Sequence, residues 1–225
     1  VLADIDRHQV THLHLVPTQM LRLLRLDEAI RDGFSGASLQ RAYHGAAPCP
    51  DWVKRAMIEW WGPIITEYYG GTEAGFLTTI SSTEWLERPG SVGRPGPNVE
   101  VTVVDAEGRP VPPRQHGVVQ FRSRQGHDFE YHNAEAKTAE AHPEPGVGTL
   151  GDIGWFDEEG YLFLSDRSID MIVSGGVNIY PAEIEAVLSE HPALVDVSVV
   201  GLPEPEMGEQ VVAVVQTQPG RLLDE

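Results

Sequence analysis

The densest group of side chains able to do chemistry lies between Glu67 and Gly75, in the run Glu-Tyr-Tyr-Gly-Gly-Thr-Glu-Ala-Gly. A ring such as that of Tyr69 can stack on a planar base, and paired glycines let the backbone approach a ligand closely. The Thr72 hydroxyl can donate to a phosphate oxygen, and the Glu73 carboxylate can hold a hard cation such as Mg²⁺. Taken alone, however, the run is better interpreted as a tight turn with a surface acid.

Two later segments add to this set. Asp152 stands between Gly151 and Ile153-Gly154, and a carboxylate so placed can accept hydrogen bonds from the two hydroxyls of a ribose. Arg167 leaves an expected strand in a chain poor in basic residues, so it is a candidate contact for a phosphate or a ribose. The flexible stretch 174–176, Ser-Gly-Gly, carries little side chain and could line a narrow channel. In isolation a turn acid, a surface salt bridge and a loop are the simpler interpretations.

The composition and net charge of the chain limit the classes of protein to which it can belong. The chain has 225 residues, is 41% hydrophobic and 22% charged, and carries 34 Asp and Glu against 16 Lys and Arg, a formal charge of -18. Such a surface repels nucleic acid, so an anionic cofactor must be held by local donors. A single cysteine, Cys49, excludes a disulfide within the chain and favours the cytoplasm. We expect no transmembrane segment and no signal segment, and both ends look like cuts through a longer chain.

The segments that contain these candidate residues lie in three regions of different expected secondary structure. Strands and helices alternate up to Tyr69, which indicates an α/β layer, whereas strands dominate from residue 97 and a mixed pattern returns after Arg167. We therefore predict an α/β subdomain over 1–96, a small β-barrel subdomain over 97–168 and the start of a small α+β domain over 169–225. The expected strands are 9–16, 40–44, 64–69, 99–105, 117–123, 161–164, 171–173, 194–200 and 211–216, and the expected helices are 18–33 and those opening at Pro50 and Pro181.

In this order and spacing the segments resemble the ANL superfamily of adenylating enzymes, which includes acyl- and aryl-CoA ligases, peptide-synthetase adenylation domains and luciferases. The resemblance covers nearly the whole chain, from Thr11 to Gln216. It implies the C-terminal part of the ANL large domain, an α/β layer and small β-barrel, followed by a small α+β domain. The matching motifs are His44 to Pro48, Tyr69 to Glu73, Gly151-Asp152, Asp166-Arg167, Gly175-Gly176 and Pro181 to Glu185.

The resemblance also implies a role for each matching residue. Thr72, Glu73 and Arg167 would be catalytic, with Thr72 on the α-phosphate and Glu73 on the magnesium. Asp152 would bind both ribose hydroxyls, and Arg167 the ribose or a phosphate. The remaining nucleotide contacts would be Gly45, Ala46 and Ala47 in the adenine pocket, and Tyr69, beside Gly70, would stack on the adenine. Gly175 and Gly176 would line the channel that the pantetheine arm of coenzyme A enters.

The implied activity is ATP-dependent activation of a carboxylic acid to an acyl-adenylate, followed by transfer to coenzyme A. The cofactors would be ATP or AMP, Mg²⁺ and coenzyme A, and the partners a small-molecule acid but no nucleic acid; a homodimer stays open. The texture of Tyr180 to Glu183 and of Trp60 to Pro63 is closer to fatty-acyl CoA ligases than to peptide-synthetase domains. Two alternatives remain: a carrier-protein thiol as acceptor, or a nucleotide-binding module that has lost catalysis.

Three departures from the family pattern bear on this expectation. The Gly- and Ser/Thr-rich phosphate loop, which would lie upstream, is absent, and the lysine that engages the carboxylate would lie beyond Glu225. At the hinge, two residues after Arg167, the family usually has Asp or Lys, whereas this chain has Ile169. We therefore expect the fragment to be incomplete for adenylation and the small domain to rotate near Ile169.

Three weaker signals are discounted. The run from Gly146 to Gly151 matches the dinucleotide pattern G-x-G-x-x-G, but it lacks the strand before it and the helix after it, so we interpret it as a loop. His8, His12 and His14 have loosely metal-like spacing, yet His8 precedes the expected strand, so ordinary strand and surface histidines are favoured. Cys49 lies between two prolines with no evident base, which favours a buried inert thiol.

Overall fold

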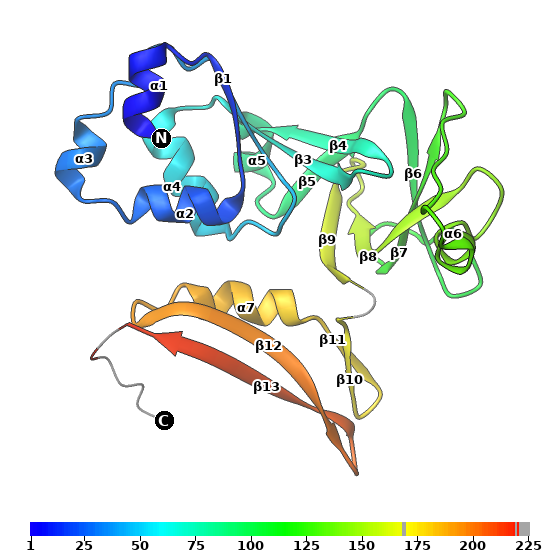
Figure 1. Cartoon of the computed structure of the whole chain (residues 1–225). Coiled ribbons are helices and arrows are strands. Elements are labelled where there is room, and N and C mark those ends of the chain that lie inside the picture. Colours follow the sequence, from blue (N-terminus) through cyan, green and yellow to red (C-terminus); the bar gives the residue numbers. More distant parts are fainter. Residues whose placement is uncertain (168–169, 219, 221–225) are drawn as a thin grey trace.

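A computed structural model describes residues 1–167, 170–218 and 220. Its strands form two sheets, and Figure 1 shows the smaller one, with its helix α7, beneath the larger one in that view. The strand order is β1-β2-β3-β4-β5-β9-β8-β7-β6 in the larger sheet and β11-β10-β13-β12 in the smaller. Within the described part of the chain, no helix has both the length and the apolar character needed to cross a membrane.

Three parallel strands begin the larger sheet. They are β1 (His12–Leu15), β2 (Arg41–His44) and β3 (Ile65–Gly71), and their carboxyl ends meet at one edge. The helices that accompany them are α1 (Leu2–His8), α2 (Pro17–Leu24), α3 (Glu28–Asp32) and α4 (Asp51–Trp61). Met20 of α2, Val53 and Met57 of α4, and Ile65 of β3 are buried together in one hydrophobic cluster. In α/β sheets this carboxyl edge is the usual place for a ligand.

The sheet then continues with antiparallel strands. β4 (Gly75–Ser81) returns along β3, and β5 (Ser91–Pro95) follows it after α5 (Ser82–Glu87). A capping box starts α5, because the Ser81 hydroxyl accepts from the Glu84 amide while the Glu84 carboxylate accepts from the Ser81 amide. Trp85, on this short helix, is buried in the same cluster as α2 and α4. The helix thereby anchors the connection between β4 and β5.

A second antiparallel group extends the sheet from β5. It consists of β6 (Val99–Val104), β7 (Gly117–Ser123), β8 (Gly148–Phe156) and β9 (Leu162–Arg167), with α6 (Glu135–Ala141) between β7 and β8. Buried apolar residues recur at every second position in β6 and β7, so Val101 and Val119 face a core that also holds Tyr69 of β3. β9 pairs with both β5 and β8, which brings the ends of β8 and β9 beside the β3–β4 turn.

The smaller sheet follows β9. Its strands are β10 (Ile172–Ser174), β11 (Val177–Ile179), β12 (Leu194–Glu204) and β13 (Gly208–Thr217), and α7 (Pro181–Ser189) packs on β12. Pro181 occupies the first turn of α7, where its missing amide hydrogen costs nothing. The buried apolar residues of this part include Leu194 and Val199 of β12 and Ile172 of β10.

The predicted fold class is confirmed, an α/β layer with a further β part and a small α+β unit, although several element bounds were wrong. The strand expected over 9–16 starts only at His12, because residues 2–8 form α1. The single helix expected over 18–33 is two helices, since Asp27 adopts an extended backbone between them. Asp152, for which a turn was the simpler interpretation, lies within β8. The division at residues 96 and 168 stays a prediction.

Candidate nucleotide site

The centre of the candidate site is a hydrogen bond between two strands far apart in sequence. Tyr69 near the end of β3 is 8% exposed, and its hydroxyl donates to Oδ2 of Asp152 on β8 at 2.7 Å. Burial, together with the Asp152 carboxylate, raises the pKa of the Tyr69 hydroxyl far above its usual range. The phenol therefore stays protonated and remains a donor to Asp152.

Arg167 completes this group from the neighbouring strand. Asp152 and Arg167 are paired across β8 and β9, and Arg167 Nε lies 3.8 Å from Asp152 Oδ1. The Arg167 side chain is 70% exposed, so solvent screens the pair and the side chain can turn toward a ligand. Burial raises the pKa of Asp152, although the Tyr69 hydroxyl and Arg167 act in the opposite direction. The three residues that the sequence predicted to converge are brought together here.

The turn between β3 and β4 holds the next two predicted residues. Thr72 is exposed and Glu73 half-buried, and the Glu73 Oε1 atom accepts a hydrogen bond from the Tyr131 hydroxyl at 3.0 Å. A β-bulge between Tyr69 and Gly70 redirects the chain just before this turn. A Cβ on Gly70 would stand 1.9 Å from the Gly75 carbonyl oxygen, so only glycine fits there.

Glu73 suits one mode of magnesium binding. Among the described residues there is no cluster of three His, Cys, Asp or Glu side chains that could hold an ion unaided. Mg²⁺ in nucleotide sites is commonly held by one or two carboxylates, with phosphates and waters supplying the other ligands. A single half-buried carboxylate beside the exposed hydroxyl of Thr72 fits that mode.

The predicted adenine-pocket residues follow β2 at the same sheet edge. Gly45 is buried, and a Cβ there would stand 2.6 Å from the Tyr68 carbonyl oxygen, so this glycine lets the two strand ends approach. Ala46 and Ala47 are exposed, and Ala46 has a φ of 69°, an uncommon left-handed backbone for an alanine. Strain of this kind is frequent at ligand sites. Their contact with a nucleotide stays a prediction.

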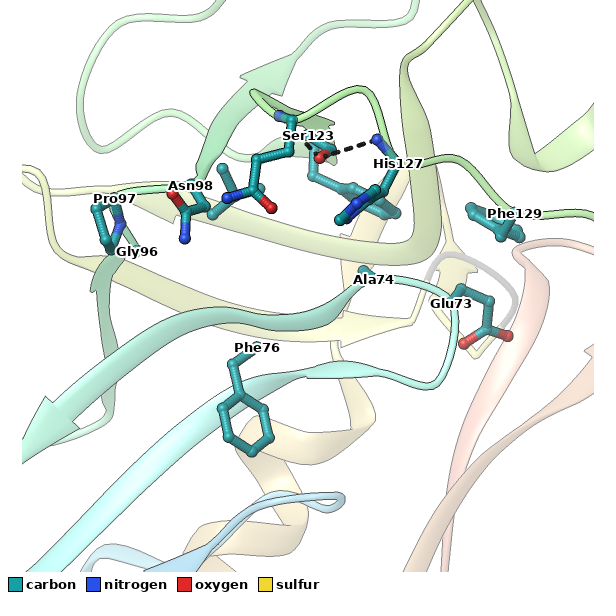
Figure 2. A pocket seen from close by; sticks show the side chains of 12 residues that line it. Glu73, Ala74, Phe76, Gly96, Pro97, Asn98, Ser123, His127 and Phe129 are labelled. Atoms are coloured by element: carbon teal, nitrogen blue, oxygen red, sulfur yellow. Dashed lines mark hydrogen bonds between the residues drawn. The ribbon is translucent and has the colours of Figure 1, made fainter.

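A cleft adjoins Glu73 on the side of β4 and β7. Figure 2 shows Phe76 on one side of it and Asn98, Ser123 and His127 across from it, with Glu73 at the turn. Its volume is about 200 Å³. Because pockets that enclose a drug-sized ligand usually measure about 300–1,000 Å³, this cleft can receive only part of a molecule the size of ATP.

The predicted coenzyme A contacts lie elsewhere. Gly175 and Gly176 form the tight turn between β10 and β11, with φ values of 57° and 81°, and Gly175 donates its amide to the Met207 carbonyl at 2.8 Å. The stretch therefore has a defined turn geometry, and its flexibility stays a prediction. Among the described residues, no hydrogen bond or ion pair joins this turn to Tyr69, Asp152 or Arg167. The predicted hinge, Ile169, lies outside the described residues.

The structure also places the three sequence signals that were discounted: the G-x-G-x-x-G run, the three histidines and Cys49. The run from Gly146 enters β8 at Gly148, so its second half is strand rather than loop, and no helix follows it directly. His8 ends α1 whereas His12 and His14 lie on β1, where His14 Nε2 is 2.8 Å from the Tyr68 hydroxyl. Cys49 is half-buried, and burial raises the pKa of its thiol to about 12.

Tyr131 is the site residue that sequence reasoning missed. Its partner Glu73 lies 58 positions away, and the segment around it has neither strand nor helix periodicity. The available signal was the pair of aromatic residues Phe129 and Tyr131 in a long connection between two strands, because such connections frequently carry function.

Comparison with known proteins gives consistent matches. A family model described as AMP-binding enzyme matches residues 1–126, and one described as AMP-binding enzyme C-terminal domain matches residues 183–225. The long-chain-fatty-acid–CoA ligase of Bacillus subtilis strain 168 is 33% identical over 224 residues, covering 99% of this chain and 39% of that protein. The chain thus spans about two fifths of the length of the curated relatives it matches.

Two solved structures are similar over almost the whole chain. The amide bond synthetase McbA from Marinactinospora thermotolerans has a TM-score of 0.89 at 33% identity, covering 99% of this chain and 46% of that one. The o-succinylbenzoate CoA synthetase MenE from Bacillus subtilis, solved with the acyl-adenylate intermediate OSB-AMP, has a TM-score of 0.84 at 30% identity, covering 98% and 44%.

Proposed function

Because this chain belongs to the AMP-binding enzyme family, we propose that it forms part of an enzyme that uses ATP to activate a carboxylic acid as an acyl-adenylate and then transfers the acyl group to coenzyme A. The observation that carries this proposal is the convergence of Tyr69, Asp152 and Arg167, which come from three strands. A carboxylate, a cation and an aromatic side chain at one sheet edge match the ribose, the phosphates and the base of a nucleotide.

Asp152 is the proposed ribose ligand. Its Oδ2 atom accepts from Tyr69, and each carboxylate oxygen has two lone-pair positions, so acceptors remain for two ribose hydroxyls. The Tyr69 hydroxyl holds the carboxylate in place, while Arg167, which is exposed, can move to a ribose or phosphate oxygen. Tyr69 itself is mostly buried, so only the exposed part of its ring would touch the adenine.

The first half-reaction joins the acid to AMP. An oxygen of the substrate carboxylate attacks the α-phosphorus of ATP, the bond to the bridging oxygen breaks, and pyrophosphate leaves with that electron pair. Thr72 donates a hydrogen bond to an α-phosphate oxygen, and Glu73 provides the carboxylate for magnesium, which would neutralise phosphate charge when bound. Arg167 adds a second cation in a chain whose overall charge is strongly negative.

The second half-reaction transfers the acyl group. The sulfur of coenzyme A attacks the acyl carbon, the thiol proton is lost, and AMP leaves with the electron pair of the anhydride bond. Gly175 and Gly176 are the proposed contacts of the pantetheine arm. Since no hydrogen bond or ion pair of the described residues joins them to Asp152 or Arg167 in this arrangement, we propose that the smaller sheet rotates between the half-reactions, with Ile169 as the hinge.

The proposed acid is a fatty acid or a related acyl compound. The long-chain-fatty-acid–CoA ligase of Bacillus subtilis supports this class. The name of McbA, an amide bond synthetase, favours a second candidate, in which the adenylate is passed to an amine rather than to a thiol. A carrier-protein thiol is the third acceptor to be compared. A cytoplasmic location and a homodimeric state stay predictions.

The decisive experiment measures ATP–pyrophosphate exchange by the protein at its natural length over a panel of carboxylic acids. Acceptors are then compared by supplying coenzyme A, a phosphopantetheinylated carrier protein or an amine. We expect exchange with fatty acids and release of AMP on addition of coenzyme A. Nucleotide binding without exchange for any acid would favour a module that has lost catalysis.

Asp152→Ala tests the nucleotide site itself. Removing a charged acceptor from the ribose hydroxyls should weaken ATP binding about tenfold or more, measured by calorimetry, since hydrogen bonds to charged groups contribute about 1.5–3 kcal/mol. Asp105→Ala is the matched control, because Asp105 accepts hydrogen bonds only within its own turn, from Glu107 and Arg109. Equal ATP affinity in the two variants would remove the ribose role of Asp152.

A further inference from the structure

The connection between β7 and β8 brings a tyrosine to the β3–β4 turn. The Tyr131 hydroxyl donates to Oε1 of Glu73 at 3.0 Å, across 58 positions of sequence. The other carboxylate oxygen, Oε2, lies over Gly71, where a Cβ would approach it to 2.9 Å. One oxygen of Glu73 is thus held by the tyrosine, while the other lies beside Gly71 in the β3–β4 turn.

The aromatic residues near Tyr131 fix where its ring lies. The Phe129 ring meets that of Tyr131 edge-on, with centroids 5.5 Å apart at 76°, and packs against Phe121 of β7 at 6.3 Å. A Cβ on Gly148 would stand 3.1 Å from the Phe129 ring and 2.7 Å from the Phe121 ring. The absence of a side chain at Gly148 therefore makes room for the phenylalanines that support Tyr131.

Hydrogen bonds also join the two halves of the segment 128–142, which contains Tyr131. The Tyr131 amide donates to the Thr138 hydroxyl at 2.9 Å, and the His142 ring contacts the Thr138 carbonyl at 2.9 Å and Asp128 Oδ1 at 2.5 Å. Both partners of the His142 ring are acceptors, so the doubly protonated form donates to both. Burial alone would lower the pKa of His142, but the bonds to Thr138 and Asp128 outweigh it and raise the pKa.

We infer that Tyr131 is a positioning residue, which fixes the Glu73 carboxylate so that its Oε2 atom faces the magnesium and the nucleotide phosphates. The inference rests on the proposed function, because it concerns the metal role of Glu73. A glutamate side chain has several rotatable bonds, and ordering them on binding costs free energy. A hydrogen bond made beforehand removes that cost from the binding step, and a bound tyrosine at Oε1 prevents the metal from drawing the carboxylate away from the turn.

The test is a Mn²⁺ titration, followed by electron paramagnetic resonance, of the natural-length protein with an ATP analogue that has a methylene group between the α- and β-phosphorus atoms. Tyr131→Phe should weaken Mn²⁺ binding about tenfold, as expected for one lost hydrogen bond to a charged group at a half-exposed position. AMP affinity without metal and the melting temperature should stay at their parent values, because the phenylalanine keeps the packing against Phe129.

Tyr161→Phe is the matched control, since the Tyr161 hydroxyl, just before β9, makes the same kind of bond to Glu84 Oε1 on α5, at 3.2 Å. It should leave Mn²⁺ binding unchanged. If Tyr131→Phe lowers metal-free AMP affinity and melting temperature as much as Mn²⁺ affinity, the role of Tyr131 is structural and the inference fails.

Glu73→Gln separates this inference from the proposed function. If Glu73→Gln abolishes Mn²⁺ binding while Tyr131→Phe leaves it unchanged, Glu73 keeps its proposed role and Tyr131 does not position it. If Glu73→Gln also leaves Mn²⁺ binding unchanged, the proposed metal role of Glu73 fails, and the positioning inference fails with it.

Discussion

A buried ion pair between Lys54 and Glu67 joins the helix α4 to the strand β3 beside the candidate site. Lys54 of α4 is fully buried, and its Nζ contacts Oε2 of Glu67 on β3, two residues before Tyr69. The ammonium also lies 4.7 Å from the centre of the Trp85 ring. Burial lowers the pKa of Lys54 and raises that of Glu67, while each group opposes the shift of the other. The pair is thus tolerated only because the two groups compensate each other.

His44 lies next to this pair and differs from it. Its Nε2 is 3.7 Å from Glu67 Oε2, and neither ring nitrogen has a hydrogen-bond partner among the described residues. Burial lowers the pKa of His44 to about 3, with the Lys54 charge acting in the same direction. The imidazole is therefore neutral at neutral pH and adds no second charge to the pocket around Glu67.

Lys54→Met should destabilise the protein by about 3–5 kcal/mol, because it leaves the Glu67 carboxylate buried without its partner. Replacing both residues, Lys54→Met with Glu67→Leu, should recover most of that loss, since no buried charge then remains. Free energies of unfolding from urea denaturation measure both effects.

The exposed pair of Arg114 and Glu158 supplies the control. Their side chains are 64% and 62% exposed, and Arg114→Met should cost less than about 1 kcal/mol. Equal losses for Lys54→Met and Arg114→Met would show that burial of the Lys54 pair has no energetic consequence.

At the scale of elements, the β3–β4 hairpin shapes the site through its glycines. Across this turn Gly70 is paired with Phe76 and Gly75 with Gly71, and the two glycines Gly70 and Gly75 have different surroundings. A Cβ on Gly70 would overlap the Gly75 carbonyl, whereas a Cβ on Gly75 would meet nothing within 4 Å and would suffer only from its φ of 65°. The two positions therefore separate steric overlap from backbone strain.

Gly70→Ala should cost about 3 kcal/mol or more, because the backbone of the hairpin must move to relieve the overlap, and AMP affinity should fall as Tyr69 moves with it. Gly75→Ala should cost only about 1–2 kcal/mol, the price of a left-handed backbone for an L-residue. Thermal unfolding and AMP calorimetry on both variants measure the difference. An equal, small effect would mean that the hairpin accommodates a side chain at Gly70 freely.

The strands were the elements best predicted from sequence. The expected strands 99–105 and 117–123 agree with β6 and β7 to within one residue, because buried apolar residues recur at every second position, as with Val99, Val101 and Val103 in β6 and Val119 and Phe121 in β7. The helix α6, Glu-Ala-Lys-Thr-Ala-Glu-Ala, was missed because its residues favour a helix without forming an apolar stripe. The helix α1 was missed because only Leu2 and Ile5 mark its buried side.

Site residues could be predicted from the sequence only where they belong to a recognisable motif. Tyr69, Asp152 and Arg167 were expected to converge through a family resemblance, and the pairing of β8 with β9 supplies the geometry. Tyr131 could not be found this way, because its bond to Glu73 depends on tertiary packing around Phe129. The burial of Lys54 has no sequence signal either, since lysine is exposed by default and its partner lies on another element.

For the whole molecule, the important contact joins the larger sheet to the smaller one. Asp166 near the end of β9 accepts the amide of Ala182 in the first turn of α7 at 3.0 Å, and Tyr180 stacks on His116 with ring centroids 5.2 Å apart. The N-cap residue Tyr180 makes no side-chain cap bond. Asp166, which lies outside the helix, instead accepts one of the free amide hydrogens of its first turn. The negative carboxylate also suits the positive end of the α7 dipole.

Asp166→Ala should therefore loosen α7 without unfolding the larger sheet. One hydrogen bond contributes about 1 kcal/mol, so the amide of Ala182 should exchange with solvent about five times faster, measured by hydrogen–deuterium exchange on peptides covering 181–189. Asp196→Ala is the control, because Asp196 accepts only from the adjacent Val197 amide. A bond of this strength holds one arrangement of the two sheets yet breaks readily, as the proposed rotation of the smaller sheet requires. Unchanged exchange in Asp166→Ala would mean that α7 is held by its packing on β12 alone, and the proposed rotation would then have to break that packing instead.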